Sequence, residues 1–367
     1  MKQHILFIID GLPGGGAENI TLALAKGIYQ RGHHVTVLSL SQRQDYEIPQ
    51  GIDYIVDHDN GRGPLRKLTE LTRRAASLDR QLSNLFAKSG RPALVISSLH
   101  KTDRIVVRSR ELQSCNVWHC VHGMLSRSYL GNKTGLRRWI KQRKMQQVYK
   151  NRNMIAVSDA VGDDLIQQLG LQPAQLVTIY NPFNIPELEQ RANAVNPFAG
   201  EEYVLHVGRF HPVKRHDRLL EAFALAQLPC KLVLIGQGEE QIKAAIEEKI
   251  STLGIQQQVI MAGFNPNPLP AIKGARMVAL SSDSEGLPTV LIEALICRTP
   301  IVSTGCPGGV AEIMSGVLAA YMAEMNAESL AEKLKLAWNN PPTITPEIYQ
   351  RFDQECIIDK YLSLIEK

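Results

Sequence analysis

The sequence predicts an α/β protein built from two doubly wound domains. Short β-rich apolar runs alternate with helical patterns through most of the chain, which indicates repeated β-α-β units and parallel sheets with helices on both faces. The alternation stops once, near residues 181–200, and then begins again. The length of 367 residues is enough for two domains of about 150 to 200 residues each.

The elements of the first half follow in order along the chain. Strands are expected at residues 4–9, 34–40, 53–56, 93–97, 116–122, 154–158 and 176–180, and long helices at 16–31, 64–88 and 135–150. The stretch 181–200, with three prolines and few alternating apolar residues, is predicted to be a linker. In the second half, strands are expected at 203–208, 231–236, 258–263, 276–281 and 300–304, with helices near 214–227, 238–252, 289–297 and 327–338.

These boundaries predict an N-terminal domain of residues 1–184 and a C-terminal domain of residues 185–343. The remaining stretch, about 344–367, has helical spacing and could pack back on the first domain. Ligands of doubly wound sheets bind at the carboxyl ends of the strands, so we expect the active site in a cleft between the two domains.

Composition excludes several classes of protein. With 44% hydrophobic and 21% charged residues the chain is neither disordered nor fibrous. The five apolar residues before Asp10 are too short a run for a signal peptide or a spanning helix, so a cytoplasmic location is expected. Six scattered cysteines without a C-x-x-C pair predict reduced thiols rather than disulfides or zinc. Basic residues predominate in the first half, which predicts an anionic partner.

The stretch GLPGGGAENIT, residues 11–21, begins like a phosphate-binding loop. Ala17 and Glu18 stand where a nucleotide-triphosphate loop needs Lys and Ser or Thr, and no acidic residue ends the second strand as a dinucleotide site would require. The glycines of the turn, Gly15 and Gly16 among them, still let backbone amides and the helix dipole receive phosphate oxygens or a polar sugar. Glu18 either caps this helix or contacts a substrate.

Two stretches of the second half combine cations with carboxylates. In VGRFHPVKRHD, Gly208 permits a turn after a strand, and Arg209 and Lys214 suit a diphosphate. In SSDSEGLPTVLIEAL, Glu285 lies in a loop after a strand and Glu293 lies one turn into the following helix. Paired carboxylates serve glycoside hydrolysis, but they also accept hydrogen bonds from sugar or ribose hydroxyls. The neighbouring cations favour a nucleotide sugar as ligand.

These two stretches together resemble the donor half of the retaining GT-B glycosyltransferases of family four. The segments GLPGGGAENIT, HGM, AVSDAVGDDL and IYNPFN resemble first-domain landmarks of that family in the expected order, so the resemblance spans roughly residues 5–313. Within that family, the sequence is similar to enzymes of bacterial lipopolysaccharide and O-antigen synthesis. It implies transfer of a hexose or N-acetylhexosamine, with N-acetylgalactosamine or galactose favoured, from a UDP-sugar to a lipid-diphosphate-linked saccharide.

The resemblance also implies roles for individual residues. Arg209 and Lys214 would bind the donor diphosphate beside Gly208, Glu285 would face the transferred sugar, and Glu293 would hold the ribose. The amides of Gly286 and Leu287 would approach the phosphates, His122 would lie over the reacting sugar, and Gly15 and Gly16 would approach the donor. Glu18 would be on the acceptor side. No cofactor and no metal are expected. A nucleotide-sugar epimerase of the same architecture and a catalytically silent scaffold remain alternative functions.

Two further stretches bear on metals and membranes. Asp57-His58-Asp59 matches the D-x-D pattern by which another glycosyltransferase fold holds a metal, but it is predicted to be a solvated turn far from the donor motifs. Residues 133–152 carry eight basic residues, no acidic residue and apolar residues at helical spacing. This pattern predicts a helix that lies on an anionic membrane at the inner face of the plasma membrane, or one that packs on its own domain. No nucleic-acid-binding module is present, so nucleic acid is not expected as a partner.

Overall fold

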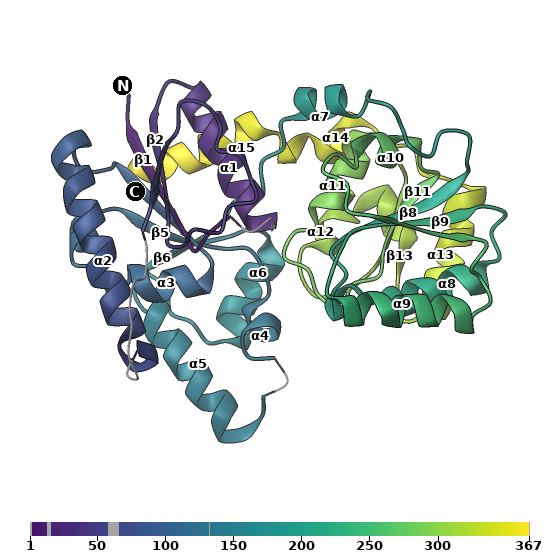
Figure 1. The fold of residues 1–367 in the computed structure, drawn as a ribbon, viewed down its shortest axis with the longest axis horizontal. Coiled ribbons are helices and arrows are strands. Elements are labelled where there is room, and N and C mark those ends of the chain that lie inside the picture. Colours follow the sequence, from purple (N-terminus) through teal and green to yellow (C-terminus); the bar gives the residue numbers. More distant parts are fainter. Residues whose placement is uncertain (1, 13–15, 58–65, 132, 367) are drawn as a thin grey trace. The chain divides into compact units, whose positions relative to one another are not determined.

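The structure is a computed structural model that describes residues 2–12, 16–57, 66–131 and 133–366. The chain divides into two compact units, one formed by Met1–Pro182 with Gln354–Lys367 and the other by Phe183–Asp353. Each unit is a parallel β-sheet with helices on both faces (Figure 1). The predicted fold class, two doubly wound α/β domains, is confirmed.

The sheet of the first unit has the strand order β3-β2-β1-β4-β5-β6-β7, so the direction of winding reverses between β1 and β4. Its strands are β1 His4–Ile9, β2 His34–Ser39, β3 Asp53–Val56, β4 Leu94–Ser98, β5 Val117–Val121, β6 Asn153–Ala156 and β7 Gln175–Thr178. Its helices are α1 Gly16–Gln30, α2 Arg66–Ser89, α3 His100–Val106, α4 Leu125–Ser128, α5 Gly135–Tyr149, α6 Asp159–Asp163 and α15 Gln354–Leu362. Short 3-10 helices cover Glu111–Ser114 and Ser363–Glu366, and a π-helical turn covers Asp164–Gln168.

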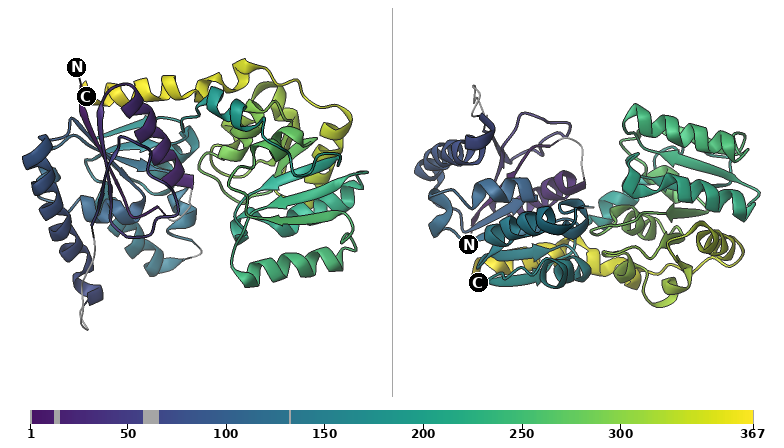
Figure 2. Two further views of the ribbon diagram at one scale, coloured as in Figure 1. Left: turned by 45° about the horizontal axis from the view of Figure 1, so that its top comes forward. Right: turned by 90° about the horizontal axis from the view of Figure 1, so that it is seen from below.

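Leu6 and Ile8 lie on one face of β1, because alternate side chains of a strand share a face. Leu6 and Ile8 pack in one buried cluster with Leu78 and Leu82 of α2. Elsewhere in the unit α1 contacts α15, and the two helices lie side by side in Figure 2. Gly27 of α1 allows this close approach, because a Cβ at Gly27 would lie 2.4 Å from the Ile358 side chain. The C-terminal helix therefore completes the core of the first unit.

The sheet of the second unit has the order β10-β9-β8-β11-β12-β13, with the reversal between β8 and β11. Its strands are β8 Tyr203–Val207, β9 Lys231–Ile235, β10 Val259–Gly263, β11 Met277–Leu280, β12 Ile301–Thr304 and β13 Met322–Ala323. Its helices are α7 Ile185–Arg191, α8 His216–Ala226, α9 Glu240–Thr252, α10 Leu269–Gly274, α11 Thr289–Ile296, α12 Val310–Ile313, α13 Ala327–Asn339 and α14 Pro346–Tyr349. Short 3-10 helices cover Pro212–Lys214, Gly316–Tyr321 and Gln350–Phe352. Helices α8, α9 and α13 form one group, and α7, α10, α11 and α14 form the other (Figure 1).

Two local predictions are wrong. The predicted linker contains α7, which begins where the Asn184 side chain accepts a hydrogen bond from the Glu187 amide at 3.2 Å, a normal N-cap. Asp57 is not solvated: it is 4% exposed and accepts a hydrogen bond from Ser77 Oγ at 2.7 Å. The other two residues of the D-x-D pattern, His58 and Asp59, lie outside the described residues.

Candidate functional site

The reversal of winding in the second unit brings two distant loops together. β8 and β11 are hydrogen-bonded neighbours, so the loops that follow them leave the same edge of the sheet side by side. The first loop carries Gly208, Arg209 and Lys214, and the second carries Glu285. The crevice at such a reversal is where open α/β sheets bind ligands, which makes this edge the candidate site.

The centre of the site is a contact between a lysine and a glutamate. Lys214 Nζ donates to Glu285 Oε1 at 2.6 Å, and the side chains are 21% and 12% exposed. Ser282 Oγ donates to the same oxygen at 2.5 Å. Among the described residues, Glu285 Oε2 has no hydrogen-bond partner, so this second oxygen can accept a hydrogen bond from a ligand hydroxyl.

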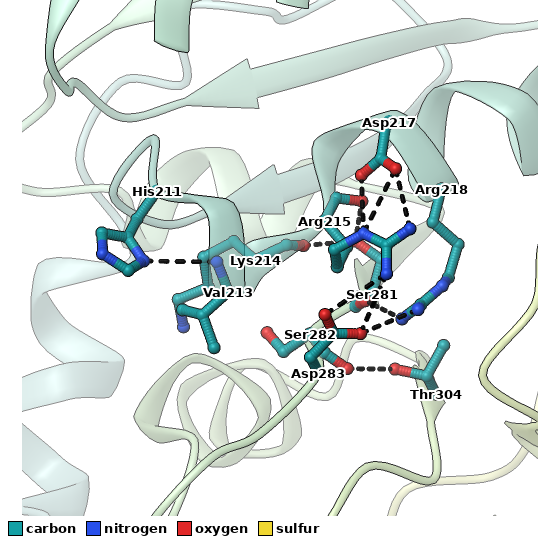
Figure 3. Close-up of polar contacts among 10 residues, drawn as sticks. All are labelled: His211, Val213, Lys214, Arg215, Asp217, Arg218, Ser281, Ser282, Asp283 and Thr304. Atoms are coloured by element: carbon teal, nitrogen blue, oxygen red, sulfur yellow. Dashed lines mark hydrogen bonds and ion pairs between the residues drawn. The ribbon is translucent and has the colours of Figure 1, made fainter. Parts of the chain in front are cut away.

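A network of arginines and aspartates holds the two loops together (Figure 3). Arg218, only 5% exposed, donates to the Ser281 carbonyl at 2.8 Å and to Asp283 Oδ1 at 2.8 Å. Arg215 lies between Asp283 and Asp217 and donates to both carboxylates. Ser281 Oγ donates back to the Lys214 carbonyl at 2.7 Å. The network fixes the backbone on both sides of the Lys214–Glu285 contact.

The Glu285 loop is also fastened to the loop after β12. The Glu285 amide donates to the Pro307 carbonyl at 3.1 Å, and the Gly309 amide donates to the Gly286 carbonyl at 2.8 Å. Between them Gly308 has a φ of +118°, and a Cβ there would lie 1.6 Å from the Glu285 carbonyl oxygen. Only glycine fits this position. Leu287 is buried, two residues before the start of α11.

Arg209 and Lys214 differ in their surroundings. Arg209 is exposed after β8, and within the described part of the chain it has no carboxylate within 4.0 Å. Lys214 does not open α8 as predicted; it ends the 3-10 turn Pro212–Lys214, and α8 begins two residues later. Beside Lys214, burial lowers the pKa of His206 to about 4 and that of His216 to about 3, so both rings are neutral near pH 7.

Glu293 lies apart from these hydrogen bonds, in the second turn of α11. Burial raises the pKa of its carboxyl to about 7, although the charge of Arg191 from α7 acts in the opposite direction. The neutral carboxylic acid can donate as well as accept a hydrogen bond. No described hydrogen bond joins Glu293 to Glu285 or Lys214, so the structure does not bring the two predicted glutamates into one contact.

The first unit gathers three of its polar residues at its own winding reversal. His122, directly after β5, has its Nε2 3.4 Å from Ser98 Oγ at the end of β4. Ser98 Oγ lies 3.5 Å from Thr21 Oγ1 of α1. Burial lowers the pKa of His122 to about 4, so its ring is neutral at pH 7. Ser98 and Thr21 were not predicted, because a lone hydroxyl carries little sequence signal.

The other residues predicted in the first unit lie around the start of α1. Gly16 is the first residue of α1 and is exposed, while Glu18 follows in the first turn and is 8% exposed. A carboxylate in the first turn stabilises the helix dipole. Gly15 lies outside the described residues.

The predicted membrane helix is α5, and its apolar residues divide into two sets. Leu136, Trp139 and Ile140 are 71%, 54% and 40% exposed. The three later apolar residues, Met145, Val148 and Tyr149, are buried in the core. The first half of α5 thus presents apolar side chains to solvent, and the second half packs on its own domain. None of the helices in the described ranges is long and apolar enough to cross a membrane.

Comparison with known families identifies the chain. The model of Glycosyltransferase Family 4 matches residues 14–186, and the model of Glycosyl transferases group 1 matches residues 189–355. The chain belongs to the family 4 GT-B glycosyltransferases. The winding reversal with Lys214 and Glu285 lies in the second matched region, and His122 lies in the first.

Relatives of this glycosyltransferase build bacterial glycans. It is 24% identical to the N-acetylgalactosamine-N,N'-diacetylbacillosaminyl-diphospho-undecaprenol 4-alpha-N-acetylgalactosaminyltransferase of Campylobacter jejuni, with 91% of this chain and 89% of that protein covered. It is 25% identical to the amylovoran biosynthesis glycosyltransferase AmsD of Erwinia amylovora, covering 94% and 96%. The structure of Anabaena HepE in complex with UDP and glucose matches with a TM-score of 0.79, 19% identity and 99% of both chains covered. This structural likeness supports the GT-B fold.

The raised pKa of Glu293 makes the stability of the enzyme depend on pH. Between the ordinary value of 4.5 and the folded value of about 7, the native state keeps a proton that the unfolded chain has lost, so the free energy of unfolding falls as pH rises. Glu293 alone should lower the free energy of unfolding by about 2 to 3 kcal/mol over this pH range. Glu293→Gln, which cannot ionise, should lose less stability between pH 5 and 8, measured by urea unfolding at each pH.

The matched control is Glu332→Gln, which removes an exposed carboxylate from α13. This variant should keep the pH dependence of the parent enzyme. If Glu293→Gln and the parent gave parallel stability curves, the raised pKa of Glu293 would be wrong.

Proposed function

We propose that this glycosyltransferase is a retaining enzyme that moves a hexose or N-acetylhexosamine, in the first place N-acetylgalactosamine or galactose, from a UDP-sugar to a lipid-diphosphate-linked saccharide. The product would be a bacterial surface glycan of the lipopolysaccharide or O-antigen class. The observation that carries the proposal is the Lys214–Glu285 contact at the winding reversal of the second unit. The names of the Campylobacter transferase and of the UDP complex of HepE support the acceptor and donor classes.

The charges at this edge suit the departure of a nucleoside diphosphate. An ammonium group has three N–H donors, so Lys214 can keep its bond to Glu285 and still donate to phosphate oxygens. Arg209, exposed beside it, adds a planar fork of donors for a second pair of oxygens. As the bond between sugar and phosphate breaks, the negative charge that grows on the diphosphate is stabilised by both cations.

Glu285 serves the sugar rather than the phosphate in this proposal. Its Oε1 is occupied by Lys214 and Ser282, which leaves Oε2 to accept a hydrogen bond from a sugar hydroxyl. The amides of Gly286 and Leu287, just before α11, would approach the phosphates, where the dipole of that helix favours negative charge. Glu293, half protonated near pH 7, would hold the ribose hydroxyls as donor or acceptor.

The first unit supplies the acceptor side and the attachment to a membrane. The neutral ring of His122 would lie over the reacting sugar, Gly15 and Gly16 would approach the donor, and Glu18 in the first turn of α1 would be on the acceptor side. The exposed Leu136, Trp139 and Ile140 of α5 are flanked by basic residues, a combination that binds the interface of an anionic membrane. We therefore place the enzyme on the cytoplasmic face of the plasma membrane.

Removal of the lysine tests the diphosphate role. Lys214→Ala should lower turnover by about a hundredfold, because the transition state loses one of its two cations. Release of UDP from UDP-sugars is measured with and without a lipid-diphosphate-linked saccharide, and release is expected only with that acceptor.

The control for this variant is Lys243→Ala, which removes a solvent-accessible lysine from α9 and should leave turnover unchanged. Near-normal turnover of a folded Lys214→Ala enzyme would contradict the diphosphate role. Donor consumption without any acceptor would favour an epimerase, and no consumption at all would favour a scaffold.

The proposal includes metal-independent transfer, because Arg209 and Lys214 provide the positive charge that a metal ion supplies in other transferases. Full activity is therefore expected in excess chelator. The measurement compares initial rates in EDTA and in EDTA followed by excess manganese. A rate that is lost in chelator and restored by manganese would overturn this part of the proposal.

The exposed apolar side chains of α5 should drive membrane binding. Replacement of Leu136 and Trp139 by Ser should weaken binding to phosphatidylserine vesicles about tenfold, since each side chain buries part of its apolar surface in the interface. Co-sedimentation measures the bound fraction. A double change of Leu225 and Phe264 to Ser, at exposed positions of the second unit, is the matched control. Equal vesicle binding by the parent and the α5 variant would reject the membrane role of this helix.

A further inference from the structure

A second cationic site lies in the first unit, in a pocket of about 490 Å³ that none of the roles above uses. Its wall carries four cations, Arg104 and Arg108 around the end of α3, Lys144 of α5, and Arg152 just after α5. His100 and Tyr129 complete its polar lining, and the other lining residues are apolar apart from Gln147. None of the lining residues that the structure describes is acidic.

The four cations are not neutralised by neighbouring carboxylates. In the ranges that the structure describes, none of them has a carboxylate oxygen within 4.0 Å. The nearby acid, Asp103, is fully buried and accepts hydrogen bonds from Ser97 Oγ and from the Tyr149 hydroxyl, the latter at 2.7 Å. It also lies 2.9 Å from His119 Nδ1. Asp103 is thus engaged by these buried partners and does not line the pocket.

Two of the cations also have a structural role. Arg152 Nε donates to the Val148 carbonyl at 3.0 Å, and the Arg108 guanidinium donates to the Arg104 carbonyl. Each caps the end of a helix, where a cation is favoured. Burial lowers the pKa of Arg152, because a partly buried guanidinium is less well solvated than an exposed one. Arg104 and Lys144 have no such carbonyl partner among the described hydrogen bonds, so helix capping does not explain them.

His100 adds an acceptor to this basic wall. The Tyr149 hydroxyl donates its single proton to Asp103, so it must accept from His100 Nδ1 at 2.9 Å. In the neutral ring, Nε2 therefore carries a lone pair. Tyr129 packs edge-on against His100, with ring centroids 4.4 Å apart, and also lies under the Lys141 ammonium. The pocket thus combines several cationic donors with an aromatic wall.

We propose that this pocket binds a phosphate-bearing ligand, with a diphosphate group as its favoured occupant. Guanidinium groups recognise phosphate oxygens through paired N–H donors, and several cations in one recess suit a multiply charged group. The volume is many times the share of one water molecule, about 30 Å³, so a diphosphate with part of a sugar fits. The proposal is independent of the donor site, because that site lies in the other unit.

The test measures pyrophosphate binding by isothermal titration calorimetry in the full chain carrying Arg209→Gln and Lys214→Gln. This background removes the proposed donor contacts, so the result does not depend on the proposed function. Adding Arg104→Gln and Lys144→Gln should weaken pyrophosphate binding at least tenfold. The matched control adds Arg80→Gln and Lys88→Gln, the same loss of charge at exposed positions of α2, and should change affinity less than twofold.

Equal affinity in the pocket variant and its control, or no pyrophosphate binding at all, would overturn the proposal. Circular dichroism checks the fold of each variant. If the double change of Arg104 and Lys144 prevented folding, Lys144→Glu alone would serve, because Lys144 is exposed and its charge reversal should weaken binding at least as strongly.

A second arm identifies the source of the phosphate. Vesicles with phosphatidic acid are compared with phosphatidylcholine vesicles in co-sedimentation, with and without pyrophosphate. If the Arg104 and Lys144 changes and added pyrophosphate both reduce binding to phosphatidic acid, the natural ligand is a lipid headgroup. If vesicle binding stays unchanged while pyrophosphate binding is lost, the ligand is a free phosphate compound.

Discussion

The parallel pairing of β8 with β11 is the constraint on which the candidate site of the second unit depends. Met277 and Val278 pair with Val204 and Leu205, so both strands end at the same edge of the sheet. Lys214 and Glu285 are 71 positions apart in the sequence, yet a hydrogen bond joins their side chains. The pairing therefore determines which loops are neighbours at this edge, and the contact between Lys214 and Glu285 depends on it.

The acids and bases of this edge have separate tasks. Asp283 and Asp217 are bound by Arg215 and Arg218, so these four charges hold the backbone. Lys214 shares one carboxylate oxygen and keeps donors for a ligand. The neutral His206 and His216 add no positive charge beside it at pH 7. The arrangement concentrates the cations that can act on a diphosphate at Lys214 and Arg209, above a framework whose charges are already paired.

Much of this could be predicted from sequence, because the patterns concerned are local. Apolar strands such as HILFII and KLVLIG repeat with the β-α-β spacing, and turns after strands place Arg209 and Glu285 on loops. The arginine network could not be predicted, since Arg218 and Asp283 are 65 positions apart and ordinary in type. The need for glycine at position 308 could not be predicted either, because it comes from the Glu285 carbonyl, which would clash with any Cβ there. The helix α7 was missed because its stretch contains prolines, which are common in linkers. Proline is also common in the first turn of a helix, as it is in α7.

The basic residues of the first unit show why a count of charges along the sequence is not enough to predict which anionic partner they bind. The eight cations of residues 133–152 predicted one basic helix face. In the structure Lys144 lines a pocket with Arg104 of α3 and Arg108 just after it, while Leu136 and Trp139 remain exposed in the first half of α5. A flat basic face attracts any anionic surface, whereas cations that converge from two helices into a recess select for a compact, multiply charged group. The two proposals for α5 therefore rest on different side chains of the same helix, the exposed Leu136 and Trp139 for a membrane and Lys144 for a phosphate-bearing molecule.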